Sequence, residues 1–297
     1  MNEDDLKARW KACNPSVTAS DYMSSIRQIQ GPPEFVALLY QDNHAGDNSK
    51  PIATLGSLKI FSRARIRAPY HVTLRSIDAP TPRPGKVFSG WNWQLSPEML
   101  EDAIEFACCT DFVVTLSTVK SGAGTPLSVH LQGVPKVVEW QNEQYHLFRS
   151  LLASKNTSSL RQGTPKISIQ DYPIFVAKVA GPRAAVCEKV LALSLGYDSL
   201  RSYNLIVSRP LEDETEGDLE VVAFFVPRRL DGLVIPETSG PLHSALGSWE
   251  MGGVFLTKEE GAFRQLNFEN IVNMLSEVSI GRGAQEERLI KNLLRNL

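Results

Sequence analysis

The amino-acid sequence predicts an α+β protein in which antiparallel sheets carry packed helices. Extended runs rich in Val, Leu, Ile, Phe and Tyr follow one another as adjacent pairs, which favours antiparallel pairing. Segments of helical period stand between some of these runs, but without the strict strand-helix-strand rhythm of a doubly wound fold. The 297 residues are enough for one large domain or two small ones.

The first 32 residues are polar, and the helix expected there runs from Ser20 to Gln30, where Gly31-Pro32-Pro33 stops it. Three extended runs follow, in which apolar and polar residues interleave as they do in half-buried strands. The stretch between the first two runs, Gln41 to Lys50, has the composition of a loop. The expected strands are Glu34 to Tyr40, Leu58 to Ile66 and His71 to Ile77.

A helix start follows a loop rich in Pro and Gly, Asp78 to Asn92. In Ser96-Pro97-Glu98, serine can cap the helix, proline fits the first helical position and glutamate favours the helix dipole. A buried strand is expected next, from Asp111 to Ser117, and a turn of small residues, Lys120 to Pro126, leads into another strand, Val129 to Val134. The apolar face of the expected helix consists of Met99, Leu100, Ala103, Ile104, Ala107 and Cys108.

The polar stretch from Ser150 to Gly163 is the expected boundary between two halves. The element order of the second half loosely repeats that of the first, although no residue-level repeat is visible. We therefore expect an N-terminal extension over residues 1–33, a first half over 34–150 and a second half over 151–297. In the second half, strands are expected at Tyr172 to Val179, Tyr203 to Ser208, Leu219 to Val226 and Gly253 to Thr257, and helices at Pro182 to Leu195 and from about Phe268 and Gln285.

Composition and charge exclude several function classes. The 31 basic and 33 acidic side chains leave a net charge of −2, so no overall field holds a nucleic acid or an anionic membrane. No apolar run reaches the ~20 residues of a membrane helix, and the acidic start is unlike a secretory signal, which predicts a cytoplasmic protein. No Walker loop and no GxGxxG motif occurs. The four cysteines form no CxxC pair, so the sequence predicts no metal site, no disulfide framework and no cofactor.

The segment from Ser121 to Gly133, SGAGTPLSVHLQG, carries the pattern most typical of a functional site. Small residues in a turn let backbone N–H groups approach an oxyanion closely. His130 follows this turn on the expected strand, and Gln132 and Ser128, two residues away on either side, point to the same face. Three polar side chains should therefore converge beside a bound phosphate.

This segment resembles the histidine-triad (HIT-like) superfamily, in the branch of galactose-1-phosphate uridylyltransferase, diadenosine polyphosphate phosphorylase and GDP-sugar phosphorylase. That branch carries a Ser-Gly-Ala-Ser type turn followed by His-x-His-x-Gln, and its second histidine attacks the α-phosphorus to form a nucleotidyl-histidine. The resemblance implies that His130 is this nucleophile and that the Gln132 amide holds a phosphoryl oxygen. The residues that match the phosphate-side turn are Ser121, Gly122 and Ala123.

The chain departs from that pattern at two points. Ser128 stands where the first histidine would be, and the turn is about one residue longer than the usual one. Because the missing histidine is a supporting group and not the nucleophile, the pattern fits an active enzyme, but it also fits a decayed site that only binds nucleotides. Three segments of the second half are similar to the paired strands, the Pro-Arg element and the closing region of the same phosphorylases, which implies two fused HIT-like halves. These segments are Tyr203 to Val207, Phe224 to Arg229 and Ala245 to Val254.

The resemblance implies a nucleotidyltransferase or phosphorylase that cleaves a pyrophosphate-linked nucleotide, either a dinucleotide or a nucleotide sugar, through a nucleotidyl-His130 intermediate. Neutral imidazole is nucleophilic near pH 7, and basic donors must face the charge on the phosphoryl oxygens. The candidates for these donors are Lys120, Arg228 and Arg229. The implied acceptor is inorganic phosphate or a sugar phosphate, whereas water would make the protein a nucleotide hydrolase. A non-catalytic nucleotide-binding protein and an unrelated α+β domain with a chance match are the alternatives.

The remaining histidines have no metal-ligand spacing to another histidine or cysteine. For His44, His71, His146 and His243 a structural or solvated role is expected, against a contact with substrate or a role as acid. Alternating arginines, Arg63, Arg65 and Arg67 with Arg75, could bind a second phosphate or simply face solvent. Trp91 and Trp93, with Asn92 between them, could stack on a base or pack in the core. The acidic segment of residues 212–220 is expected to be a solvated hairpin tip.

Overall fold

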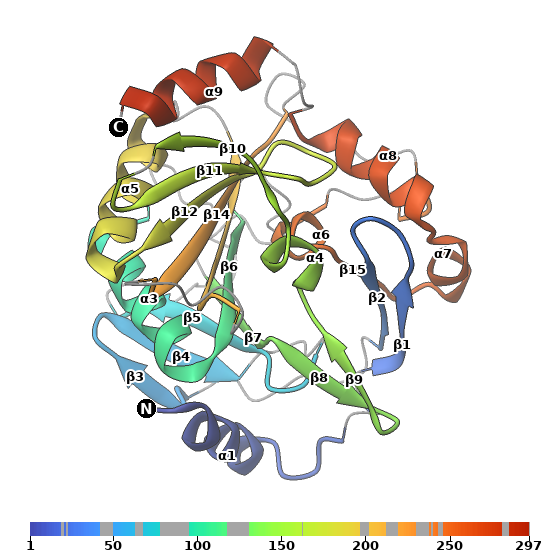
Figure 1. Cartoon of the computed structure of the whole chain (residues 1–297). Helices are drawn as coiled ribbons and strands as arrows, with labels where there is room; N and C mark the ends of the chain where they lie inside the picture. Colours follow the sequence, from blue (N-terminus) through green and yellow to red (C-terminus); the bar gives the residue numbers. More distant parts are fainter. Residues whose placement is uncertain are drawn as a thin grey trace, which may run out of the picture.

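The protein is an α+β protein with antiparallel sheets and packed helices, so the fold class predicted from the sequence is confirmed (Figure 1). The structure is a computed structural model. It describes residues 1–18, 21, 23–41, 50–62, 68–77, 95–117, 131–161, 163–196, 202–211, 219–229, 238, 240–242, 246–280 and 285–296.

A ten-stranded sheet forms the centre of the molecule, and every neighbouring pair of its strands is antiparallel. The strands lie in the order β10-β11-β12-β14-β13-β6-β7-β5-β4-β3. From the first half they are β3 (Ala53–Leu55), β4 (Leu58–Ser62), β5 (Val72–Ser76), β6 (Phe112–Ser117) and β7 (Leu131–Pro135). From the second half they are β10 (Asn156–Arg161), β11 (Lys166–Gln170), β12 (Ala177–Gly181), β13 (Tyr203–Ser208) and β14 (Val221–Pro227).

The strand order reads the same from both edges of this sheet. Each group of five contains three strands, a helix and then two more strands, and the groups meet where β6 pairs with β13. The helices are α3 (Pro97–Thr110) and α5 (Arg183–Gly196), which pack against each other on the sheet (Figure 1). The division into residues 34–150 and 151–297 stays a prediction, but the two groups of strands form one continuous sheet.

Helix α3 begins where the sequence predicts it. The Ser96 side chain accepts a hydrogen bond from the backbone N–H of Met99 at 3.2 Å, and Pro97 occupies the first helical turn. The helix ends at Asp111, whose φ of 54° lies in the left-handed region. The apolar face buries Met99, Leu100, Ala103, Ile104, Phe106, Ala107 and Cys108.

A second, three-stranded sheet holds β1 (Met23–Ile29), β2 (Phe35–Tyr40) and β15 (Val254–Thr257). The helix expected from Ser20 to Gln30 is therefore wrong, because β1 occupies most of it. Residues 23, 26 and 29 of β1 are buried, a spacing of three that is also typical of a helix, and the pairing of β1 with β2 is irregular between Met23 and Ser25. Strands β8 (Val137–Trp140) and β9 (Glu143–His146) form a separate hairpin.

Other differences concern short or exposed elements. The polar stretch from 150 to 163 contains the end of α4 (Arg149–Leu152) and the edge strand β10, whose residues are almost all exposed, so no apolar alternation marks it. Residues 172–176 are not in the strand expected there. An unpredicted helix, α1 (Glu3–Cys13), buries only Leu6 and Trp10. The remaining described helices are α6 (Ser248–Met251), α7 (Glu260–Gln265), α8 (Phe268–Val278) and α9 (Gln285–Asn296).

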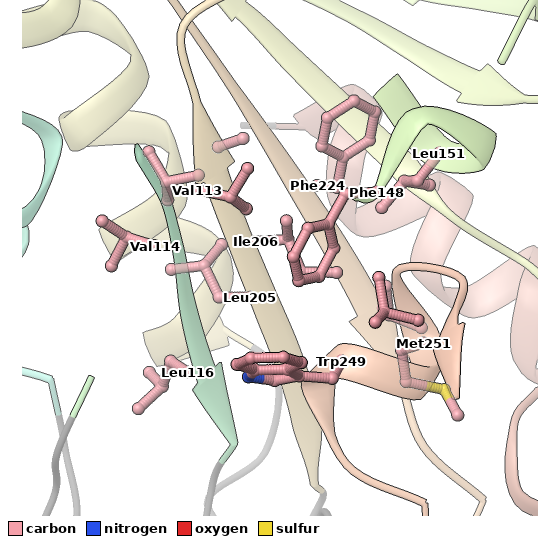
Figure 2. Packing of buried hydrophobic residues seen from close by; sticks show 14 of the residues in the cluster. Val113, Val114, Leu116, Phe148, Leu151, Leu205, Ile206, Phe224, Trp249 and Met251 are labelled. Carbon is pink, nitrogen blue, oxygen red and sulfur yellow. The ribbon is translucent and has the colours of Figure 1, made fainter. Parts of the chain in front are cut away.

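The short helix α6 docks into the hydrophobic core beside β6 and β13. Figure 2 shows its Trp249 and Met251 among side chains of those strands and of Phe148. Trp249 is 3% exposed, and its ring makes an edge contact with Phe148 at 6.0 Å between centroids. The core thus fixes the place of α6 at the end of β6, where strand β7 begins on the neighbouring side.

Replacing Gly253 by alanine should destabilise the fold by about 3 kcal/mol. Gly253 has φ of +94°, and a Cβ there would collide with the side chain of Ser150. The measurement is the midpoint of urea unfolding. Gly261→Ala in α7 is the matched control, because a Cβ at Gly261 meets nothing within 4 Å and alanine favours a helix. Equal midpoints for Gly253→Ala and the wild type would contradict the prediction.

Candidate functional site

Three of the predicted site residues lie in described parts of the chain. Gln132 is the second residue of β7, and Arg228 and Arg229 directly follow β14. The other predicted site residues, His130, Lys120, Ser121, Gly122, Ala123 and Ser128, lie outside the described residues. The same holds for His44, His243, Arg63, Arg65, Arg67, Trp91, Asn92, Trp93 and residues 212–218.

Gln132 belongs to a row of polar side chains that crosses three strands. In the sheet register Gln132 pairs with Thr115 of β6 on one side and with Thr73 of β5 on the other, so the three side chains share one face. Both threonines are buried. The opposite face belongs to α3, because a Cβ on Gly133 would lie 3.0 Å from the ring of Phe106. The polar row therefore faces away from α3.

The side-chain oxygen of Gln132, Oε1, lies against two buried aromatic rings. The indole nitrogen of Trp249 donates a hydrogen bond to Gln132 Oε1 at 3.1 Å, and His71 Nε2 lies 3.1 Å from the same oxygen. His71 is 0% exposed and its ring centroid lies 5.1 Å from that of Trp249. Gln132 itself is half-buried. The structural role expected for His71 therefore brings it into contact with a predicted site residue.

Hydrogen bonds hold the backbone at His71 and the backbone next to Trp249. The Trp10 indole of α1 donates to the His71 carbonyl oxygen at 3.1 Å, and the His71 N–H donates to Ala68 at 3.3 Å. The backbone N–H of Ser248, next to Trp249, donates to the side-chain oxygen of Ser117 at 3.0 Å. Because these bonds come from β6, α1 and the segment before β5, three separate parts of the chain hold the environment of one amide.

A chain of hydrogen bonds continues from Ser117, the last residue of β6, to Arg228. Asn204 of β13 donates from Nδ2 to Ser117 Oγ at 3.0 Å and accepts from Arg228 Nη1 at 2.7 Å. Asn204 is completely buried. We call the residues joined in this way the site network. They are His71, Ser117, Gln132, Asn204, Arg228, Ser248 and Trp249.

Arg228 is a buried cation, only 2% exposed. Its Nη1 also donates to the Leu246 carbonyl at 2.7 Å, and its Nε donates to the Val278 carbonyl at 3.0 Å. Nη2 is buried and has no hydrogen-bond partner among the described residues. Burial lowers the pKa of the guanidinium to about 10, and the charge of Glu250 opposes this shift. In this arrangement the Arg228 side chain ties β14 to the segments before α6 and after α8.

Arg229 differs from its neighbour because its side chain is exposed. Its backbone N–H donates to the Val278 carbonyl at 3.1 Å. An exposed cation at the end of β14 lies on the end of the sheet where β7 begins, since β6 joins β13 and β13 joins β14 in antiparallel pairs. Among the three basic candidates, only Arg229 is described and exposed.

The site network contains residues that the sequence reasoning did not select. Trp249, Ser248 and Asn204 fall within segments that carried the resemblance, but no role was assigned to them. His71 was weighed and expected to be structural or solvated. The signal that could have found it is strand register: once β5 is paired with β7, Thr73 stands opposite Gln132 and His71 lies two residues away.

Two hollows lie elsewhere in the described part of the molecule. One of about 780 Å³ lies at the opposite ends of the same strands, beside Lys136 after β7 and Arg209 after β13. Its charged groups are partly paired, since Lys136 bonds Asp111 at 2.6 Å and Arg183 contacts Glu220 at 3.7 Å. A neighbouring hollow of about 910 Å³ runs along β2, β9 and α8. Neither contains Gln132 or Arg228.

The described ranges contain neither a candidate metal cluster nor a helix that could span a membrane. No group of three His, Cys, Asp or Glu side chains in these ranges could hold a metal ion. None of the helices within the described ranges is long and apolar enough to cross a membrane. The four cysteines, all described, are free thiols, and burial raises the pKa of Cys108 and Cys187 to about 11.

Comparison with solved structures identifies the fold. No protein-family model matches the chain, and no curated protein matches its sequence. Crystal structures of yeast Ap4A phosphorylase Apa2 match almost the whole chain. The complex with AMP superposes with a TM-score of 0.63 at 15% identity over 95% of this chain and 97% of Apa2. The complex with Ap4A gives 0.60 at 13% identity over 95% and 98%.

The chain therefore has the HIT-like fold that its His130 segment led us to expect. The match runs through both halves of the ten-stranded sheet, because it covers 95% of the chain. A likeness at this level of identity describes the fold, and the chemistry has to be argued from the residues of this chain.

Proposed function

We propose that this protein is a nucleotidyltransferase or phosphorylase that cleaves a pyrophosphate-linked nucleotide. The substrate class is a dinucleoside polyphosphate or a nucleotide sugar, and the acceptor is inorganic phosphate or a sugar phosphate. The observation that carries the proposal is the Gln132 amide at the start of β7, whose oxygen accepts a hydrogen bond from Trp249. In the sequence Gln132 follows His130 by two residues. The Apa2-like fold supports the same class of substrate, since those structures hold Ap4A and AMP.

The proposed reaction has two steps. An imidazole nitrogen of His130 attacks the α-phosphorus, forming a P–N bond while the P–O bond to the leaving phosphate breaks. The leaving half departs with the electron pair of that bond. In the second step an oxygen of inorganic phosphate attacks the same phosphorus, the P–N bond breaks and His130 is regenerated. The products are a nucleoside diphosphate and the first leaving group, so atoms and charge balance.

The other residues have supporting roles in this proposal. The Gln132 amide donates a hydrogen bond to a phosphoryl oxygen, where charge grows as the P–N bond forms. Lys120 and Arg229 supply positive charge, and Ser121, Gly122 and Ala123 form the turn that cradles the phosphates. Ser128 is proposed as a further contact to the substrate. Arg228 has a supporting role in this proposal, because three of its hydrogen bonds go to protein oxygens. One of these bonds holds Asn204, which connects Arg228 to the site network.

A covalent adduct tests the proposal directly. The protein is mixed with Ap4A in phosphate-free buffer, denatured under alkaline conditions that preserve a phosphoramidate, and analysed by intact mass and peptide mapping. We expect one adenylyl group on the peptide that contains His130, and its discharge to ADP when phosphate is added. His130→Ala should give no adduct, whereas His146→Ala, which changes an exposed histidine of β9, should label normally. Turnover by His130→Ala at the wild-type rate, together with no adduct, would refute the proposal.

Ser128 favours one alternative function. Because serine stands where the motif has its first histidine, the site could bind nucleotides without turning them over. A thermal-shift series with dinucleotides and nucleotide sugars distinguishes the two functions, since a ligand bound at 100 times its Kd stabilises a protein by about 2.7 kcal/mol. Stabilisation without adduct or product would support the binding protein, whereas adduct formation supports the enzyme.

A further inference from the structure

We propose that His71 and Trp249 are positioning residues that fix the side-chain amide of Gln132, with its carbonyl inward and its NH2 group toward the substrate. The statement about the substrate rests on the proposed function, whereas the fixed orientation of the amide rests on the geometry alone. Neither ring has an assigned role in the resemblance that pointed to His130 and Gln132.

The chemistry of indole identifies the end of the Gln132 amide that faces Trp249. A tryptophan side chain has one polar atom, Nε1, and it only donates. The Gln132 atom that lies 3.1 Å from Trp249 Nε1 must therefore be an acceptor, which among the two ends of an amide is the oxygen. Oxygen and nitrogen of an amide are alike in shape, but here the donor-only partner decides between them.

The second step concerns His71. Its Nε2 lies 3.1 Å from the same oxygen, and a carbonyl oxygen can only accept. Nε2 must therefore carry a hydrogen, and both lone pairs of the Gln132 oxygen are occupied. The tautomer of His71 is therefore one that carries its proton on Nε2.

The third step is the cost of the opposite orientation. A flipped amide would direct its NH2 group at the Trp249 N–H, which would repel it, and the hydrogen bond to Trp249 would be lost. His71 could accept from the flipped group only after its proton moved from Nε2 to Nδ1. His71 and Trp249 are 0% and 3% exposed, so water cannot easily replace the lost partner. Both rings are buried, the His71 carbonyl accepts from Trp10 and the N–H of Ser248, next to Trp249, donates to Ser117, so neither ring has room to turn away and accommodate the flip. Figure 2 shows Trp249 among the core side chains. The amide therefore has one favoured orientation.

The outward end of the amide is then always a donor. Gln132 is half-buried, and within the described ranges no residue accepts a hydrogen bond from its Nε2, so as far as those residues go this group can donate to a ligand. Such an end selects acceptor oxygens, which phosphoryl groups have, and disfavours groups that can only donate. The two rings thus prepare the site for the charge that forms on phosphorus.

Nuclear magnetic resonance of the isotope-labelled full chain tests the orientation without any substrate. The Trp249 indole signal, assigned from its loss in Trp249→Phe, should show a hydrogen-bonded proton that moves upfield in Gln132→Met and downfield in Gln132→Glu. His71 Nε2 should have the shift of a protonated nitrogen. An indole signal that ignores both Gln132 substitutions, or a bare Nε2, would overturn the proposal. Trp140→Phe and Gln144→Glu, in the β8–β9 hairpin, are the matched controls.

Ligand titrations test the outward end of the amide. Inorganic phosphate should shift the Gln132 NH2 signals, whereas neutral adenosine, which lacks a phosphoryl oxygen, should leave them close to their free positions. In Gln132→Glu the phosphate response of the nearby Trp249 signal should disappear, because a carboxylate repels the ligand. A response to adenosine equal to that to phosphate would overturn the assignment of this end to a phosphoryl oxygen.

Kinetics separates positioning from simple support of the fold. Trp249→Phe and His71→Phe should each lower kcat about tenfold with little change in KM, since the contact is made mainly in the transition state. His71→Gln, whose amide NH2 can again donate to Gln132, should recover most of the loss. Gln132→Glu should lower kcat about 100-fold. Unchanged kcat in both ring variants, while His130 still forms its adduct, would overturn positioning and leave the proposed function standing.

Discussion

Replacing His130 by alanine is expected to lower turnover of a cleaved dinucleotide by at least about 10³-fold, because the covalent route loses its nucleophile. No described histidine can substitute for it. His71 is buried and its Nε2 is committed to Gln132, whereas His146 is exposed on β9 beside the hollow at the far end of the sheet. The substrate should still bind, because the Gln132 amide and the phosphate-side turn remain.

The measurement is steady-state kinetics of His130→Ala against Ap4A, with products separated by chromatography. His146→Ala is the matched control and should keep the wild-type kcat. A wild-type rate that depends on phosphate, with parallel double-reciprocal lines at different phosphate concentrations, would support the two-step route. If His130→Ala retained more than a tenth of the wild-type kcat, the reaction would not pass through a nucleotidyl-His130 intermediate.

Elements marked by local signals could be predicted from the sequence. The helix after Ser96 has a capping side chain, an early proline and an apolar face, and all three are visible in a short window. Strand β13 occupies the predicted residues. All six of its side chains are buried, and the run is mainly apolar, with Asn204 and Ser208 as polar members. These signals depend only on residues that are near each other in the sequence, so the sequence alone is enough to predict these elements.

Elements stabilised by distant partners could not be predicted in the same way. Strand β1 pairs with β2 and buries residues 23, 26 and 29, and this spacing of three is also typical of a helix. Strand β10 is an exposed edge that pairs with β11 through backbone bonds, so its polar side chains carry no periodic pattern. Helix α1 has only two buried side chains, and one of them, Trp10, donates a hydrogen bond to His71, which lies 61 residues further along the chain.

The candidate site divides along the same line. Gln132 could be found because a local motif surrounds it. His71 and Trp249 lie 61 and 117 residues from Gln132, so only the register of β5 with β7 and the docking of α6 bring them together. The sequence also suggested that Arg228 contacts phosphate, whereas three of its donors bond protein oxygens, which makes support of the site its visible role.

Replacing Arg228 by methionine is expected to lower the free energy of unfolding by about 3 kcal/mol. Two effects oppose each other. Methionine removes a buried charge whose desolvation is costly, but it also removes the donors that Arg228 supplies to the Leu246 carbonyl and to Asn204 Oδ1. The Val278 carbonyl loses one of two donors and keeps the backbone N–H of Arg229. Each buried acceptor left unpaired costs about 1–3 kcal/mol, so the loss of these hydrogen bonds should exceed the gain from removing one charge.

The measurement is urea unfolding of Arg228→Met, with Arg229→Met as the control because that neighbouring side chain is exposed. Arg228→Lys should fall between the two, since an ammonium keeps the charge but cannot reproduce the rigid fork of a guanidinium. The Trp249 indole signal should also broaden or shift in Arg228→Met, because Asn204 and Ser117 connect the two residues. Equal stability of both methionine variants would show that the buried charge costs as much as its hydrogen bonds return, and that the site network does not depend on Arg228.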